Sequence, residues 1–149
     1  MEASKVLALI RRLRHDFGNH LQVIGGFTEL GYTGEVQDYI ADLVREMGEE
    51  RILFELNDPE LSLFLLQQKL YAQEVGVMLN YQVVDITTTA SELIEELDLF
   101  AAIKSLVGEQ AKEEVVINVS IYELVDQVKV VLNSKLLTDN FKDFYIKKR

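Results

Sequence analysis

The chain has the sequence RLRHDFGNHLQVIGGFTELGYTGEVQDYI over residues 12–40, and this stretch predicts two helices joined by a tight turn. Apolar side chains recur at steps of three and four from residue 4 to residue 30, which is typical of an amphipathic helix. The members of this stripe are Val6, Ile10, Leu13, Phe17, Leu21 and Ile24. Gly31 and Gly34 bound the turn that ends this helix, because glycine adopts the left-handed cap conformation at little cost.

A second apolar stripe follows the turn and predicts a second helix. Its members are Val36, Ile40, Leu43, Met47 and Phe54. The short connection makes the two helices antiparallel neighbours. Two stripes that face each other make only a thin core, whereas two hairpins from two chains make a four-helix bundle. We therefore predict a homodimer.

The turn signal Asn57-Asp58-Pro59 divides the chain, because an Asx-Pro pair favours a turn and breaks a helix. We predict a helical hairpin over residues 1–57 and a small α/β domain over residues 58–149, which gives an α+β fold. The elements expected in the second domain are a helix at 60–75, a strand at 77–84, one helix capped near Thr89 or Ser91 that reaches Val107, strands at 115–122 and 128–132, and a solvated or frayed tail at 141–149.

Composition excludes several classes of function. The net charge of −10 argues against a general nucleic-acid binder, which needs a broad basic face. The chain contains no cysteine, so it has neither disulfides nor a thiolate metal site, and we expect a cytoplasmic location. The apolar run at residues 6–10 is too short for a membrane span, so no membrane partner is expected.

The two histidines lie on different faces of the first predicted helix. At 100° per residue, His15 falls opposite the apolar stripe, together with Arg11, Gly18, Asn19 and Gln22. His20 falls beside the stripe instead, where a structural role is the expectation. Because the two rings point in different directions, we predict no shared metal site.

The neighbours of His15 suit a phosphoryl group on its imidazole. Arg11, Arg12 and Arg14 place three cations within about one turn, and arginine forms charge-assisted hydrogen bonds with phosphoryl oxygens. Asp16 can orient the ring or take a proton, and Asn19 can hydrogen-bond a phosphoryl oxygen. The missing side chain of Gly18 allows the backbone of another protein to approach. We also assign Gln22, one turn further on, to this partner-binding face.

The segment RHDFGNHLQVIGG at residues 14–26 resembles the phosphoacceptor box R-H-D-x-x-N-x-L-x-x-I-x-G of one family of sensor histidine kinases. That family includes citrate- and quorum-sensing kinases and the sporulation initiation phosphotransferase B. The resemblance implies that His15 is phosphorylated, that Asp16 assists and that Asn19 lies beside the phosphoryl group. It also implies a dimeric four-helix bundle followed by an ATPase-like domain.

The second domain departs from the pattern of an active ATPase. The run from Lys69 through Ala72 to Gly76 resembles the opening of such a domain. The family then has a metal-binding helix N-L-x-x-N-A, but this chain has SLVGEQA at residues 105–111, with Ser105 and Glu109 at the asparagine positions. No glycine follows Gly108, so backbone amides cannot approach and cradle phosphates there. The sequence therefore predicts a degenerate domain with no nucleotide and no other cofactor.

An acceptor histidine attached to a degenerate ATPase-like domain resembles the sporulation phosphotransferase in particular. The resemblance implies an enzyme that relays a phosphoryl group between response-regulator receiver domains through His15 without ATP, with Mg²⁺ held only by the receivers. Two other interpretations stay open. One is a non-catalytic regulator that binds a kinase or receiver, and the other is the remnant of a sensor kinase.

Overall fold

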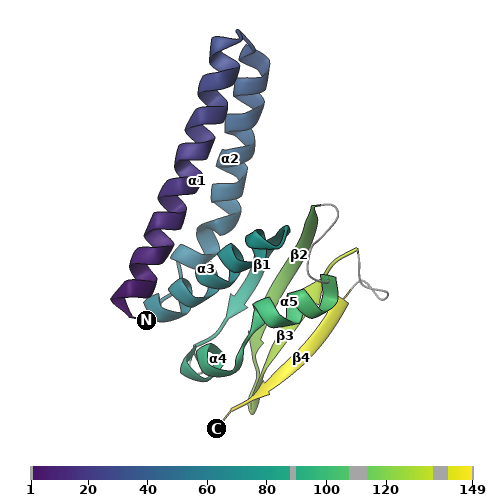
Figure 1. The fold of residues 1–149 in the computed structure, drawn as a ribbon. Coiled ribbons are helices and arrows are strands. Elements are labelled where there is room, and N and C mark those ends of the chain that lie inside the picture. The colour runs from purple at the N-terminus through teal and green to yellow at the C-terminus, as the bar shows by residue number, and fades with distance from the viewer. Residues whose placement is uncertain (1, 88–89, 108–113, 136–140, 149) are drawn as a thin grey trace. The chain divides into compact units, whose positions relative to one another are not determined.

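The computed structural model describes residues 2–87, 90–107, 114–135 and 141–148. They form two compact units, Met1–Glu49 and Glu50–Arg149. The elements in chain order are α1 (Ala3–Glu29), α2 (Thr33–Phe54), α3 (Pro59–Glu74), β1 (Val77–Asp85), α4 (Ala90–Glu96), α5 (Leu99–Val107), β2 (Val115–Glu123), β3 (Gln127–Asn133) and β4 (Phe141–Lys147). The predicted α+β class is confirmed, with a helical hairpin first and a small sheet domain after it (Figure 1).

The hairpin consists of α1 and the larger part of α2, which run antiparallel side by side (Figure 1). Gly31 has φ +76°, so the turn uses glycine in the left-handed region as predicted. The Tyr32 amide donates to the Phe27 carbonyl at 2.9 Å and closes the end of α1. Both predicted helices are therefore confirmed.

Most of the apolar stripe of each hairpin helix is exposed, which corrects the expectation that the two stripes face each other. Phe17 and Leu21 on α1 are 63% and 54% exposed, and Ile40 and Met47 on α2 are 43% and 71% exposed. The buried and half-buried positions of α1 are Val6, Leu9, Arg12, Asp16, Gly18, His20, Ile24 and Phe27, so the predicted stripe contributes only its two ends, Val6 and Ile24, to them. These positions include a guanidinium, a carboxylate and an imidazole, whereas Ile10, Phe17 and Leu21 of the stripe are exposed.

The second unit begins inside α2. Leu53 is only 1% exposed and belongs to the core of the second unit. Glu50 forms an ion pair with Lys69 of α3 at 2.7 Å, and the Lys69 side chain is 8% exposed. The side chain of Asp58 caps α3 by accepting from the Leu61 amide at 3.0 Å, so the predicted turn at Asn57-Asp58-Pro59 is where α3 starts.

The sheet of the second unit has the strand order β1-β2-β3-β4. β1 and β2 are parallel, whereas the other two neighbouring pairs are antiparallel. The three predicted strands are found where the alternation of side chains placed them. Helices α3, α4 and α5 supply the apolar side chains that cover the inner face of the sheet.

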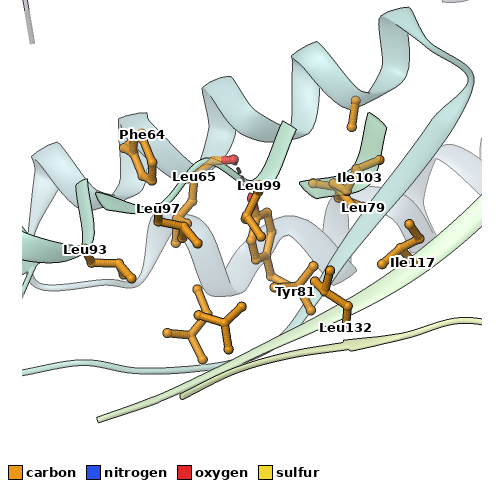
Figure 2. Close-up of a cluster of buried hydrophobic side chains, with 14 of the residues drawn as sticks. Phe64, Leu65, Leu79, Tyr81, Leu93, Leu97, Leu99, Ile103, Ile117 and Leu132 are labelled. Carbon is orange, nitrogen blue, oxygen red and sulfur yellow. Dashed lines mark hydrogen bonds between the residues drawn. The ribbon is translucent and has the colours of Figure 1, made fainter. Parts of the chain in front are cut away.

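The core lies between these helices and the sheet, and it consists almost wholly of branched aliphatic side chains (Figure 2). Fully buried examples are Leu65, Leu79, Leu99, Ile103, Ile117 and Leu132. Tyr81 of β1 brings a polar group into this core, and its hydroxyl donates to the Leu65 carbonyl at 2.9 Å, as the dashed line in Figure 2 shows. Burial raises the pKa of the Tyr81 phenol far above its usual range.

Two predictions for the second domain are wrong. The single helix expected up to Val107 is divided into α4 and α5, because Asp98 caps a new helix by accepting from the Ala101 amide at 2.9 Å. α4 already begins at Ala90, so Ser91 is not its cap, and the alternative cap Thr89 lies outside the described residues. The tail expected to be a solvated helix or frayed end is strand β4, which pairs with β3.

Candidate functional site

His15 lies on α1 with its side chain 68% exposed. Its Nδ1 atom is 3.4 Å from Oδ1 of Asp16 and 3.4 Å from Nδ2 of Asn19. These are the polar contacts of the ring among the described residues, and both are made by Nδ1. Nε2 is therefore the nitrogen available to a reaction partner.

The two contacts require opposite states of Nδ1. A neutral imidazole nitrogen is either a donor or an acceptor. Protonated Nδ1 donates to the Asp16 carboxylate and leaves a lone pair on Nε2, whereas bare Nδ1 accepts from the Asn19 amide and leaves the proton on Nε2. Only the first tautomer is a nucleophile at Nε2. Asp16 thus favours the reactive ring, and Asn19 in this orientation favours the unreactive one.

The three arginines near His15 are not equivalent. Nε of Arg12 lies 3.3 Å from Oδ1 and 3.4 Å from Oδ2 of Asp16, and the two side chains are 37% and 29% exposed. Arg11 and Arg14 are exposed on the helix surface. The structure therefore joins Arg12, Asp16, His15 and Asn19 into one contact network.

The other predicted site residues lie outside this network. Gly18, about one turn along α1 from His15, is half-buried, and Gln22, about two turns along, is exposed. A Cβ atom built on Gly18 meets nothing within 4 Å among the described residues. Packing within the described chain therefore does not require glycine at this position. The contacts of Gly18 and Gln22 with a partner protein stay predictions.

His20 has a structural partner in the hairpin. Its Nδ1 lies 2.7 Å from the hydroxyl of Tyr39 on α2, with ring centroids 5.8 Å apart. Sequence reasoning placed His20 in a structural role but missed Tyr39. A signal was present, because Tyr39 lies between the stripe members Val36 and Leu43 at helical spacing, and all three positions are half-buried.

The segments expected to bind nucleotide in an active ATPase are only partly described. Ser105 is exposed near the end of α5, and Glu109 lies outside the described residues. A hollow of about 550 Å³ lies at the C-terminal end of β3. Its polar lining residues are Asn133, Ser134 and Lys135 at that end, together with Glu114 and Asn118. Within the described ranges no group of three potential metal ligands occurs, and no helix is long and apolar enough to cross a membrane.

Comparisons with known proteins bear on the hairpin. Residues 1–56 match the family model described as sensor kinase SpoOB-type, alpha-helical domain. Over 71 residues the chain is 38% identical to the sensor protein CitS of Halalkalibacterium halodurans, a match that covers 46% of this chain and 13% of CitS. The resemblance predicted from the acceptor box is confirmed over this helical domain.

Solved structures also align with the chain. One of them is the histidine kinase ThkA in complex with the response regulator protein TrrA, and it covers 84% of this chain and 44% of the matched chain. The sequence identity is 12% and the TM-score is 0.32, so the likeness is too distant to support a conclusion about the second unit.

Proposed function

We propose that the chain is a histidine phosphotransferase of two-component signalling, because residues 1–56 match the family model of the SpoOB-type sensor kinase helical domain. In this proposal His15 accepts a phosphoryl group from the aspartate of one response-regulator receiver and passes it to the aspartate of another. The observation that carries the proposal is the ring of His15, which is 68% exposed while its Nδ1 lies 3.4 Å from the Asp16 carboxylate.

The transfer step follows from the tautomer that Asp16 favours. The Nε2 lone pair attacks the phosphorus of an acyl phosphate, a P–N bond forms, and the P–O bond to the donor carboxylate breaks with its electron pair. The imidazole becomes cationic, with its proton still on Nδ1 and directed at the Asp16 carboxylate. That carboxylate offsets the new positive charge. The reverse sequence delivers the group to a second receiver.

No ATP is needed in this scheme, because both directions start from a high-energy phosphoryl bond. We assign no cofactor to this chain, and the Mg²⁺ that assists phosphoryl transfer belongs to the acidic pocket of the receiver. Arg11 and Arg14 are exposed cations beside His15 in a chain of net charge −10. They suit docking of an acidic receiver surface, since complementary charge steers association.

A second copy of the chain is the proposed occupant of the exposed apolar stripe. Ile10, Phe17 and Leu21 on α1 and Ile40 and Met47 on α2 belong to the apolar stripes of the two helices, and each of these side chains is at least 43% exposed. Clustered exposed apolar side chains mark sites of protein–protein contact. Two hairpins that bury it against each other make a four-helix bundle with the two His15 rings outside. The second unit then has a structural and docking role.

The test is transfer from a phosphorylated receiver domain to the purified protein, followed by phosphate-affinity gel electrophoresis. Parallel lanes contain His15→Ala, His20→Ala, and the unaltered protein with ATP and Mg²⁺ but no receiver. We expect His15→Ala to abolish transfer, His20→Ala to retain it, and the ATP lane to stay unlabelled. Labelling by ATP alone would instead identify a kinase. Binding without transfer from any receiver would favour a non-catalytic regulator.

A further inference from the structure

Three arginines lie within about one turn of His15, and only Arg12 is in contact with the network around the ring. Its Nε atom is nearly equidistant from the two oxygens of Asp16, at 3.3 Å and 3.4 Å. Oδ1 of Asp16 is also the atom that lies 3.4 Å from Nδ1 of His15. One carboxylate oxygen therefore bridges the guanidinium and the imidazole.

The burial of the two side chains distinguishes this pair from an ordinary surface pair. Arg45 and Glu49 on α2 have the same spacing and a similar distance of 3.3 Å, but their side chains are 60% and 42% exposed. Arg12 and Asp16 are 37% and 29% exposed. Less solvent around the pair means less screening and less freedom for Asp16 to turn away from His15.

The orientation of Asp16 determines the tautomer of His15. Asp16 competes with Asn19 for Nδ1, and the two neighbours favour opposite tautomers. If Asp16 turns away, the Asn19 amide retains Nδ1 as an acceptor, and the proton moves to Nε2, where it occupies the nucleophilic lone pair. A cation that fixes the Asp16 carboxylate, such as Arg12, can therefore influence the tautomer of His15 without contacting the imidazole.

We propose that Arg12 is a positioning residue that holds Asp16 against Nδ1 of His15 and thereby keeps Nε2 unprotonated and reactive. This role differs from that of Arg11 and Arg14, which are exposed and assigned to partner docking. This proposal rests on the proposed function, in which His15 is the phosphoacceptor. The tautomer of the His15 ring, however, can be measured in the unphosphorylated chain.

The first measurement is the tautomer of His15 in the full ¹⁵N-labelled chain, by long-range ¹H–¹⁵N correlation at a pH where the ring is neutral. The chain contains two histidines, so a His15→Ala spectrum assigns the signals. We expect Arg12→Gln to shift the ring toward the Nε2–H tautomer and Arg12→Lys to restore part of the Nδ1–H population. Arg45→Gln, which removes the matched cation from α2, should leave the spectrum unchanged.

A double-mutant cycle tests whether Arg12 acts through Asp16. Asp16→Asn should produce at least as large a shift as Arg12→Gln, and the combined variant should shift no further than Asp16→Asn alone. Additive shifts would overturn the proposal, because they would mean an independent effect of charge. Equal shifts in Arg11→Gln or Arg14→Gln would overturn it for the same reason, and so would a wild-type spectrum for Arg12→Gln.

The second measurement is the rate at which phosphoramidate, a small phosphoryl donor, labels His15 in the absence of any receiver. A pair of this exposure is worth up to about 1 kcal/mol, so Arg12→Gln should slow labelling by about two- to fivefold. An unchanged rate would overturn the proposal. A failure of receiver transfer alongside the expected tautomer shift would contradict the proposed function and leave the role of Arg12 supported.

Discussion

The two units of the molecule use their apolar residues in opposite ways. The second unit buries its leucines, isoleucines and valines between three helices and a sheet. The hairpin leaves most of its apolar stripe on the surface and half-buries the polar side chains Asp16 and His20. The proposed chemistry belongs to the hairpin. A reactive histidine that must meet other proteins needs exposure, and a two-helix unit with little core of its own provides it.

The largest expected effect concerns the two histidines of the hairpin. His15→Gln should abolish phosphoryl transfer, because glutamine has no nucleophilic nitrogen, whereas His20→Gln should reduce it only slightly. Both changes remove an imidazole from α1. The difference between the two variants therefore compares the exposed His15 with His20, which contacts α2. The measurement is the yield of acid-labile phosphate on the chain after mixing with a phosphorylated receiver. Equal losses in both variants would mean that hairpin folding, not His15 chemistry, limits transfer.

The next effect concerns the exposed stripe. Phe17→Glu places a carboxylate in the proposed dimer interface and should convert the dimer to a monomer, because a buried unpaired charge costs several kcal/mol. Sedimentation equilibrium measures the change in mass. Arg45→Glu is the matched control, because it introduces the same side chain at an exposed position of α2 that is already charged. This variant should remain a dimer. A wild-type protein that sediments as a monomer would contradict the proposed dimer directly.

Sequence patterns predicted the hairpin well because its helices obey a simple period. The same period misled us about which line of α1 faces α2, since the apolar stripe was assumed to be the seam. Sequence spacing also did not distinguish the roles of Arg11, Arg12 and Arg14. The side-chain geometry shows that Arg12 contacts Asp16. Which of several neighbouring side chains makes a contact depends on rotamers and on local burial, and neither can be read from a single sequence.

The second unit was harder to predict at two places where local and long-range effects compete. The apolar pattern from Leu93 to Ile103 continues through the break between α4 and α5, but Asp98 supplies a cap, and the Gln68 side chain accepts from the Phe100 amide at 3.0 Å. Strand β4 carries Lys142 and Lys147, which suggested a solvated tail. Pairing with β3 overrides that composition, since Phe144 and Ile146 point toward the core.

Buried charge in the second unit gives a further contrast with the exposed charges of the hairpin. Glu50→Ala should destabilise the second unit by about 3 kcal/mol, because it leaves the buried ammonium of Lys69 without this partner. Lys69→Met removes the charge and keeps the length of the side chain, so it should cost much less. Urea denaturation followed by a probe in the second unit measures both. Similar costs for the two variants would contradict this argument, because removing the buried charge would then be no cheaper than removing its partner.

Tyr81 gives the stability of the second unit a pH dependence. Its pKa is raised by burial, so above about pH 10 the unfolded chain releases the phenolic proton while the folded chain keeps it. Stability from this group is full below pH 10 and falls by about 1.4 kcal/mol per pH unit above it. Tyr81→Phe should remove that slope and cost about 1 kcal/mol at pH 7, because the Leu65 carbonyl loses its donor. A slope that persists in the variant would assign it to other groups.

The smallest expected effect on stability tests whether the hairpin surface is built for a partner. Gly18 and Gly25 both lie in α1, and a Cβ atom at either one meets nothing within 4 Å among the described residues. Each change to alanine should therefore stabilise the helix by up to about 1 kcal/mol. Gly18→Ala should nevertheless slow transfer from a receiver, because its methyl group stands beside His15 where the partner approaches. Gly25→Ala, almost three turns from His15, should leave the rate unchanged. If both variants transfer at the wild-type rate, the glycine beside His15 is not part of the docking face, and the charges of Arg11 and Arg14 must carry recognition of the partner.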